Sequence, residues 1–200
     1  MQIFGVILAG GRGSRIGGAD KAFLSLGGQP LVGHAIARLS PQVAALAINA
    51  NGDGGRFARF GVPVLSDPIA GWLGPLAGVL AGLDWAASEG ADGVVSVAVD
   101  TPFFPGDLVP RLRMACDQSG QPIALARTAT GWHPTFGLWP VTLRAALRAA
   151  LVADQRRVLS VAQVLGAGFA DFPDTAPDGF FNINTEHDLA QAEAFAGRQP

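Results

Sequence analysis

The sequence predicts a single α/β domain of the three-layer α/β/α type, with a mainly parallel sheet covered by helices on both faces. Short apolar runs alternate with stretches of helical periodicity along the chain, which is typical of this class. The length of 200 residues suits one domain. Residues 1–200 also contain no internal repeat, linker or low-complexity tract.

The first half of the chain predicts four strands and two helices. Ile3–Leu8 is an apolar run too short for a helix and is followed by two glycines, which indicates a buried strand. A helix is expected over residues 30–39, where proline occupies a starting position. A second helix is expected over residues 75–87, where apolar residues recur every three to four positions. Further strands are expected at residues 43–48, 62–65 and 93–99, the last of which is rich in β-branched residues.

The second half continues the alternation. A helix is expected from about residue 105 to 116, before strands near 123–126 and 136–139. Leucines spaced by four residues mark another helix over 143–151. The chain is expected to finish with a short strand around residues 180–182 and a helix that Thr185 and Asp188 cap.

Composition excludes several classes of protein. The longest uncharged stretch, residues 68–83, is shorter than the ~20 residues of a membrane span and contains two prolines. A net charge of −2 and a pI near 5.8 argue against a non-specific nucleic-acid binder. Cys116 is the one cysteine, so no internal disulfide can form. The first residues lack the basic flank of a signal peptide, and a cytoplasmic location is therefore expected.

A glycine-rich loop, residues 8–21, follows the first predicted strand. Such a loop lets backbone N–H groups approach an anion closely. Its spacing fits neither of two well-known phosphate loops: Ile16 replaces the third glycine of a dinucleotide fingerprint, and Lys21 does not directly follow Gly18 as a P-loop requires. Lys21 is nevertheless the one lysine of the sequence, whose other basic residues are thirteen arginines. A surface loop with a stray lysine stays open as the alternative.

The same loop contains the segments L-A-G-G (residues 8–11), R-I-G-G (residues 15–18) and D-K (residues 20–21). It resembles the signature of nucleotidyltransferases, and in particular that of the molybdenum cofactor guanylyltransferases. The resemblance implies a Rossmann-like nucleotidyltransferase fold, in which Arg15 and Lys21 act as catalytic residues that meet the charge of a triphosphate. The nucleotide-binding residues that it implies in this loop are Leu8, Ala9, Gly10, Gly11 and Lys21.

Asp100 follows the strand predicted over residues 93–99. An aspartate at this point could simply cap the next turn. A triphosphate, however, arrives with Mg²⁺, which takes one or two carboxylates beside the phosphates. The sequence D-T-P-F-F-P resembles the metal-binding motif of the family. The resemblance therefore implies that Asp100 is a catalytic, nucleotide-contacting residue and the ligand of Mg²⁺.

Polar residues also stand where the second and third predicted strands end. Ligands bind at the carboxyl ends of parallel strands, and Asn49 and Asp67 lie at such ends. Asn51 and Asp53 are equally plausible as turn residues. The resemblance implies that Asn49 and Asp67 contact the guanine nucleotide.

Glycine recurs at every fourth position in residues 74–82. Close helix packing is the expected reason for Gly78 and Gly82. The sequence G-P-L-A-G over residues 74–78 also resembles a loop-to-helix motif of the guanylyl branch.

Later motifs carry weaker signals. H-P-T-F over residues 133–136 resembles a family motif near the second substrate, but a structural turn is the favoured interpretation of His133. F-N-I-N-T over residues 181–185 resembles the ending of the family domain. The resemblance implies that Arg156, Asn182 and Asn184 contact the second substrate, although Arg156 is also consistent with a solvated helix end.

The resemblance as a whole implies transfer of GMP from GTP to the terminal phosphate of molybdenum-molybdopterin. The products are molybdopterin guanine dinucleotide and pyrophosphate. Molybdenum-insertion and molybdoenzyme-maturation proteins are the implied protein partners, and neither nucleic acid nor membrane is expected as one. The alternatives are a cytidylyl- or sugar-nucleotidyltransferase of the same fold and a non-catalytic nucleotide-binding module.

Overall fold

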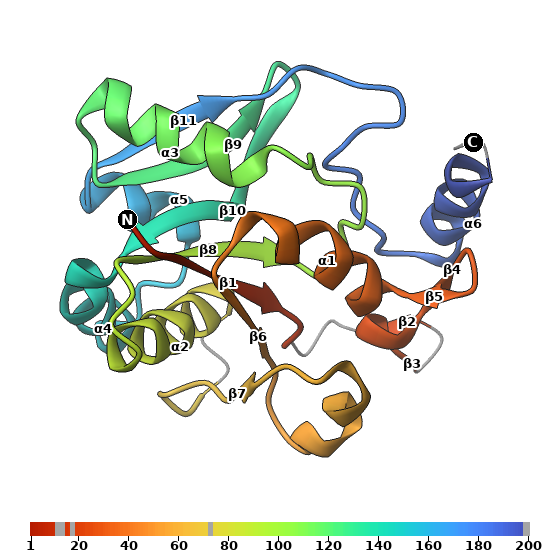
Figure 1. The fold of residues 1–200 in the computed structure, drawn as a ribbon, viewed down its shortest axis with the longest axis horizontal. Helices are drawn as coiled ribbons and strands as arrows, with labels where there is room; N and C mark the ends of the chain where they lie inside the picture. Colours follow the sequence, from red (N-terminus) through yellow and green to blue (C-terminus); the bar gives the residue numbers. More distant parts are fainter. Residues whose placement is uncertain (11–14, 17–18, 72–73, 198–200) are drawn as a thin grey trace.

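The architecture is that of a computed structural model, which describes residues 1–10, 15–16, 19–71 and 74–197. Within these residues, seven strands form one sheet in the order β11-β9-β10-β8-β1-β6-β7 (Figure 1). β10 runs antiparallel to both of its neighbours, and every other pair is parallel. The strands are β1 (Ile3–Leu8), β6 (Ala45–Asn49), β7 (Val64–Leu65), β8 (Gly93–Ala98), β9 (Ile123–Thr128), β10 (Gly131–Pro140) and β11 (Ala167–Asp171).

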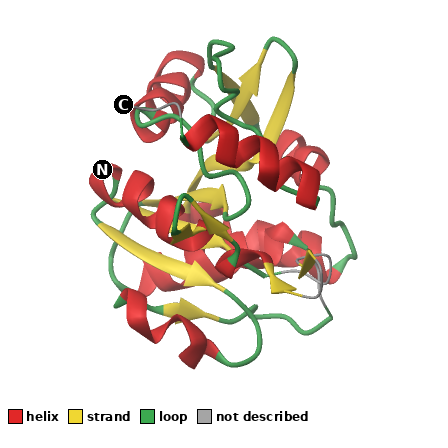
Figure 2. Ribbon diagram, turned by 90° about the vertical axis from the view of Figure 1, so that its right-hand side faces the viewer, coloured by secondary structure: helices red, strands yellow, loops and turns green. Residues whose placement is uncertain are grey.

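Helices cover both faces of this sheet (Figure 2). One face packs against α1 (Leu31–Leu39) and α3 (Leu108–Ser119). α6 (Glu186–Ala196) joins the same hydrophobic layer at its edge, where it contacts the hairpin strand β4 (Ser25–Leu26). The other face packs against α2 (Pro75–Ser88), α4 (Arg144–Val152) and α5 (Val158–Val164). The predicted three-layer fold with a mainly parallel sheet is therefore confirmed. No helix of the described ranges combines the length and the apolarity that crossing a bilayer demands.

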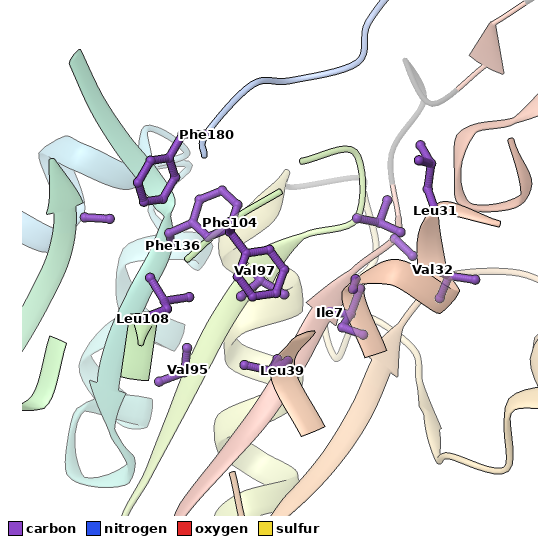
Figure 3. Packing of buried hydrophobic residues seen from close by; sticks show 14 of the residues in the cluster. Ile7, Leu31, Val32, Leu39, Val95, Val97, Phe104, Leu108, Phe136 and Phe180 are labelled. Carbon is purple, nitrogen blue, oxygen red and sulfur yellow. The ribbon is translucent and has the colours of Figure 1, made fainter. Parts of the chain in front are cut away.

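Alternate side chains of the central strands enter the two hydrophobic layers, as the period of two in a strand requires. Ile7, Val95 and Val97 are fully buried on the face of α1 and α3. Figure 3 shows them among the side chains of these helices. Val6 and Val94 are fully buried on the opposite face, against α2. Burial of each such side chain stabilises the fold by roughly 1.5–3 kcal/mol, so the central strands are firmly fixed where they lead into the site.

The expected strand over residues 180–182 does not form, and that prediction is wrong. This segment is instead a turn, in which the side chain and the carbonyl group of Asp178 accept hydrogen bonds from the backbone N–H groups of Phe180 and Phe181. Immediately after it, the N–H group of Ile183 donates to the carbonyl oxygen of Asp100 at 2.8 Å. Because the side chain and the carbonyl group of Asp178 take up these backbone donors, the segment approaches the end of β8 without joining the sheet.

Other differences lie at short elements. α5 and β11 were not predicted, because a seven-residue helix and a glycine- and alanine-rich strand carry little periodicity. The structure also adds two hairpins of two-residue strands, β2 (Arg15–Ile16) with β3 (Ala19–Asp20) and β4 (Ser25–Leu26) with β5 (Gln29–Pro30). The first hairpin lies within the glycine-rich loop, and the second carries the chain from Lys21 to α1.

Gly78 allows the first turns of α2 to lie directly against the ends of β1 and β6. A Cβ atom at Gly78 would stand 2.3 Å from Oδ1 of Asn49 and 2.6 Å from Cδ2 of Leu8. A Cβ atom at Gly82 would stand 3.1 Å from Val6. Close packing, the expected reason for both glycines, is thus confirmed.

We expect Gly78→Ala to lower the free energy of unfolding by about 1–3 kcal/mol, because the added methyl group overlaps two buried side chains. Gly33→Ala in α1 is the matched control, since a Cβ atom there meets the flexible side chain of Gln29. Because alanine has a better helix propensity than glycine, the free energy of unfolding of this variant should stay the same or rise by up to ~1 kcal/mol. Urea denaturation measures both, and equal effects would contradict the packing argument.

Candidate active site

A cavity of about 290 Å³ lies at the carboxyl edge of the sheet. Strand register creates this edge, because Leu8 of β1 is level with Asn49 of β6 and with Ala98 of β8. The loop after β7, the start of α2 and the chain near residue 182 complete its walls. The lining residues are Leu8, Gly10, Asn49, Asn51, Asp67, Gly74, Pro75, Ala98, Asp100, Thr135 and Asn182.

Lys21 is buried beside this cavity, with 7% of its side chain exposed. It lies at the start of the 3₁₀ helix η1 (Lys21–Phe23), which Asp20 caps by accepting a hydrogen bond from the N–H group of Ala22. The Nζ atom of Lys21 donates to Oδ2 of Asp100 at 3.2 Å and to Oδ1 of Asn184 at 2.7 Å. A buried ammonium group requires such partners to offset its lost hydration. The structure therefore brings together three predicted site residues from distant parts of the chain.

Asp100 stands two residues after the end of β8, and its carboxylate lines the cavity. The hydrogen bond recorded for this carboxylate goes to Lys21, not to the backbone of the following turn, which favours the site role over simple turn capping. Among the described residues, no group of three or more histidine, cysteine, aspartate or glutamate side chains could enclose a metal ion. A single carboxylate fits instead an ion such as Mg²⁺, which keeps phosphate and water ligands.

A cluster of amide groups forms the opposite wall. The Nδ2 atom of Asn49 donates to Oδ1 of Asp67 at 3.0 Å and to the carbonyl oxygen of Leu65 at 3.1 Å. The Nδ2 atom of Asn51 donates to Oδ2 of Asp67 at 2.7 Å, and Oδ1 of Asn51 accepts from the N–H group of Asp67 at 2.9 Å. Both carboxylate oxygens of Asp67 thus hold an amide group in place. Asn51 belongs to this cluster, and its position two residues after Asn49 was the available signal.

Asp53 does not belong to this cluster. Its side chain accepts from the N–H group of Gly55 at 2.8 Å and caps the 3₁₀ helix η3 (Gly54–Phe60). The interpretation of Asp53 as a turn residue is confirmed.

Arg56 is a further residue near the site that the sequence did not single out. Its Nη1 atom donates to the carbonyl oxygens of Asn51 and Asp53 at 3.1 and 2.8 Å. Its Nε atom lies 3.3 Å from Oδ2 of Asp20. Arg56 therefore connects the loop after β6 to the residue directly before Lys21.

The other predicted residues differ in how they relate to the cavity. Leu8, Gly10 and Asn182 line it. Ala9 is buried, and its N–H group donates to the carbonyl oxygen of Asn49 at 2.9 Å, so it joins the two strands.

Three further predicted contacts with the nucleotide or the substrate stay predictions. Gly11 lies outside the described residues, and for Arg15 only the backbone, in β2, is described. Arg156 lies in the exposed connection between α4 and α5, where its Nε atom donates to Oδ1 of Asp154 at 2.6 Å. The structure does not bring Arg156 to the cavity lining, so its substrate contact stays a prediction.

His133 lies in strand β10 and pairs with Ala126 of β9, so the expected turn at this residue is wrong. The surroundings of its side chain are nevertheless structural. Its ring stacks on Phe180 with a centroid separation of 4.1 Å, and its Nε2 atom lies 3.0 Å from Oγ1 of Thr128. Burial lowers the pKa of His133, and the negative charge of Asp178 opposes this effect only in part. The neutral imidazole is therefore the form that fits the fold.

We expect the stability of the protein to depend on pH through His133. Because its pKa is lowered in the folded state, the unfolded chain binds a proton below about pH 6.5 that the folded chain does not. The free energy of unfolding should therefore fall as the pH drops through 6.5 toward the folded-state pKa. Urea denaturation of the wild type and of His133→Gln between pH 5 and 8 tests this. The variant should lose part of the dependence, and parallel curves would contradict it.

Comparison with known proteins shows the family to which the chain belongs. Residues 5–166 match the family described as the MobA-like NTP transferase domain. The chain is 52% identical over 194 residues to a molybdenum cofactor guanylyltransferase of Cereibacter sphaeroides, with 97% of each protein covered. It is 46% identical over 198 residues to a protein of the same name from Bradyrhizobium sp. (strain ORS 278), with 98% of this chain and 93% of the relative covered.

A solved structure shares the fold. It is a molybdopterin-guanine dinucleotide biosynthesis protein A from Archaeoglobus fulgidus, with a TM-score of 0.79, 21% identity and coverage of 98% of this chain and 100% of that one. The resemblance carried by the sequence motifs is thereby confirmed over nearly the full chain. By its motifs, its fold and these relatives, the chain belongs to the MobA-like NTP transferase family, together with the molybdenum cofactor guanylyltransferases.

Proposed function

We propose that this protein transfers GMP from GTP to the terminal phosphate of molybdenum-molybdopterin and releases pyrophosphate. The observation that carries the proposal is the ion pair of the buried Lys21 and the partly buried Asp100 at the edge of the cavity, in a chain 52% identical to a relative named for this reaction. The cavity joins this pair to a cluster of fixed amide groups. A site for phosphates thus lies beside a site suited to a nucleobase.

The reaction needs the residues chiefly for charge and position. An oxygen of the acceptor phosphate attacks the α-phosphorus of GTP, and the bond from that phosphorus to the oxygen of the β-phosphate breaks. The acceptor is already anionic at neutral pH, so no general base is required. The difficulty is the repulsion between anions, which fixed positive groups reduce most effectively in a site that excludes water.

Lys21 is the residue placed to reduce this repulsion. Its ammonium group has three N–H donors, and two of them already point to Asp100 and Asn184. The third can donate to an oxygen of the triphosphate. Arg15, from the same loop, is proposed to add a second positive charge.

Asp100 is the residue proposed to hold Mg²⁺. When bound, this ion would supply positive charge beside the phosphates. The carboxylate of Asp100 is only partly buried, with 20% of its side chain exposed. It can therefore accept a ligand from the cavity while it keeps its contact with Lys21.

The amide cluster is proposed to recognise guanine. Asp67 fixes the side chains of Asn49 and Asn51, and fixed polar groups reject a base that leaves them unpaired. Leu8, Ala9, Gly10 and Gly11 are proposed to contact the same nucleotide through the backbone. Asn182 lines the cavity, and it is proposed, with Asn184, to contact the acceptor. The proposed contact of Arg156 with the acceptor, the contacts with maturation proteins and the cytoplasmic location remain predictions.

We expect pyrophosphate release when the protein is incubated with GTP, Mg²⁺ and molybdenum-molybdopterin. CTP in place of GTP should give at most about 1% of this rate, because a site built for one hydrogen-bonding edge discriminates by ~10² or more. Omission of the acceptor controls for simple hydrolysis. Equal rates with CTP would favour the cytidylyl alternative, and nucleotide binding without turnover would favour a non-catalytic module.

We expect Lys21→Ala to lower the transfer rate ~100- to 1,000-fold, the range for loss of one preorganised donor. Lys21→Arg should recover only part of this rate, because a planar guanidinium group does not reproduce a compact ammonium group. Arg113→Ala, which removes an exposed cation on α3, is the control and should be fully active. Steady-state rates at saturating GTP measure all three, and a fully active Lys21→Ala protein would overturn the site assignment.

A further inference from the structure

The last helix of the chain lies next to the segment that carries Lys21. The carboxylate of Glu193 on α6 accepts from the N–H group of Gly27 at 3.0 and 3.1 Å, in the turn between β4 and β5 (Figure 1). The ring of Phe195 packs edge-to-face on Phe103 and Phe181. α6 is therefore fixed relative to Lys21 from more than one side.

A chain of hydrogen bonds leads from the start of α6 to the ammonium group of Lys21. Oδ2 of Asp188 accepts from the backbone N–H groups of both Asn184 and Thr185, each at 2.9 Å. In return, Oγ1 of Thr185 accepts from the N–H group of Asp188 at 3.1 Å, which completes a capping box. The side chain of Asn184 then reaches Nζ of Lys21 at 2.7 Å. Asp188 thus binds the backbone of Asn184, and the side chain of Asn184 in turn binds Lys21.

We propose that Asp188 is a positioning residue for guanylyl transfer, acting on Lys21 through Asn184. This inference rests on the proposed function. Two acceptors fix the direction of an ammonium group better than one, and here Asn184 and Asp100 together leave one N–H donor for substrate. If Asn184 moved away, Lys21 would pair with Asp100 alone, and the carboxylate would be less available to a metal ion.

The chemistry of Asp188 suits this role. The hydrogen bond from the backbone of Asn184 is the largest cause that lowers the pKa of Asp188, so its carboxylate stays ionised at neutral pH. An ionised carboxylate only accepts hydrogen bonds and forms strong bonds to backbone N–H groups at a helix start. The alternative is that Asp188 merely caps α6.

The two halves of the capping box allow a matched comparison. Asp188→Ala and Thr185→Ala each break the capping box of α6, and both should lower the melting temperature. Only Asp188→Ala removes the bond to the backbone of Asn184. We expect kcat of Asp188→Ala to fall about tenfold, typical for loss of a supporting residue, with KM for GTP nearly unchanged. Thr185→Ala should keep kcat within about twofold, and Asp188→Asn, which retains an acceptor oxygen, should recover most of the activity.

A double-mutant cycle separates positioning from general stability. If Asp188 acts through Asn184, the double variant Asn184→Ala/Asp188→Ala should be no slower than Asn184→Ala alone. Additive losses, or equal losses in Thr185→Ala and Asp188→Ala, would overturn the proposal. A wild-type protein that transfers no GMP would instead overturn the proposed function, so the two failures are distinguishable.

Discussion

The buried ammonium group of Lys21 is the constraint on which the site depends. A charge with 7% of its side chain exposed must have partners, and these partners come from the end of β8 and from the segment before α6. The carbonyl oxygen of Asp100 also binds the N–H group of Ile183. One requirement for charge compensation therefore holds the beginning, the middle and the end of the chain together at the carboxyl edge of the sheet.

The opposite wall of the cavity depends on a different kind of constraint, which is close packing. Gly78 lets α2 touch the ends of β1 and β6, where a methyl group would overlap Asn49 and Leu8. Asp67, itself bound by the amide group of Asn51, accepts a hydrogen bond from the amide group of Asn49 and fixes it. Asn49 thus takes part in both the close packing of the fold and the polar contacts of the site, so the position of α2 sets the shape of this wall of the cavity.

Much of this could be predicted from the sequence, for identifiable reasons. The central strands and helices α1, α2 and α3 are predictable because burial gives their apolar residues a regular spacing. The site residues Asn49, Asp67 and Asp100 are predictable because they follow such strands along the chain. The turn at Phe180 could not be predicted, because its backbone donors are taken by Asp178 in place of a neighbouring strand. Likewise, the motif that contains Asn184 indicated a substrate contact, whereas its bond to Lys21 depends on how α6 docks. Local sequence patterns therefore predict the helices and strands, whereas the hydrogen-bond partner of each polar group depends on contacts between distant parts of the chain.

The distance along the chain between Lys21 and Asn184 has a consequence for synthesis on the ribosome. The two residues are separated by 163 positions, so Lys21 leaves the exit tunnel long before its partner has been made. The sheet next to Lys21 can form earlier, since β1, β6 and β8 all precede residue 100. The chain therefore passes through a stage in which most of its strands are paired while the lysine lacks one of its two acceptors. A chain released before residue 184 would therefore be folded in part while Lys21 still lacks this acceptor.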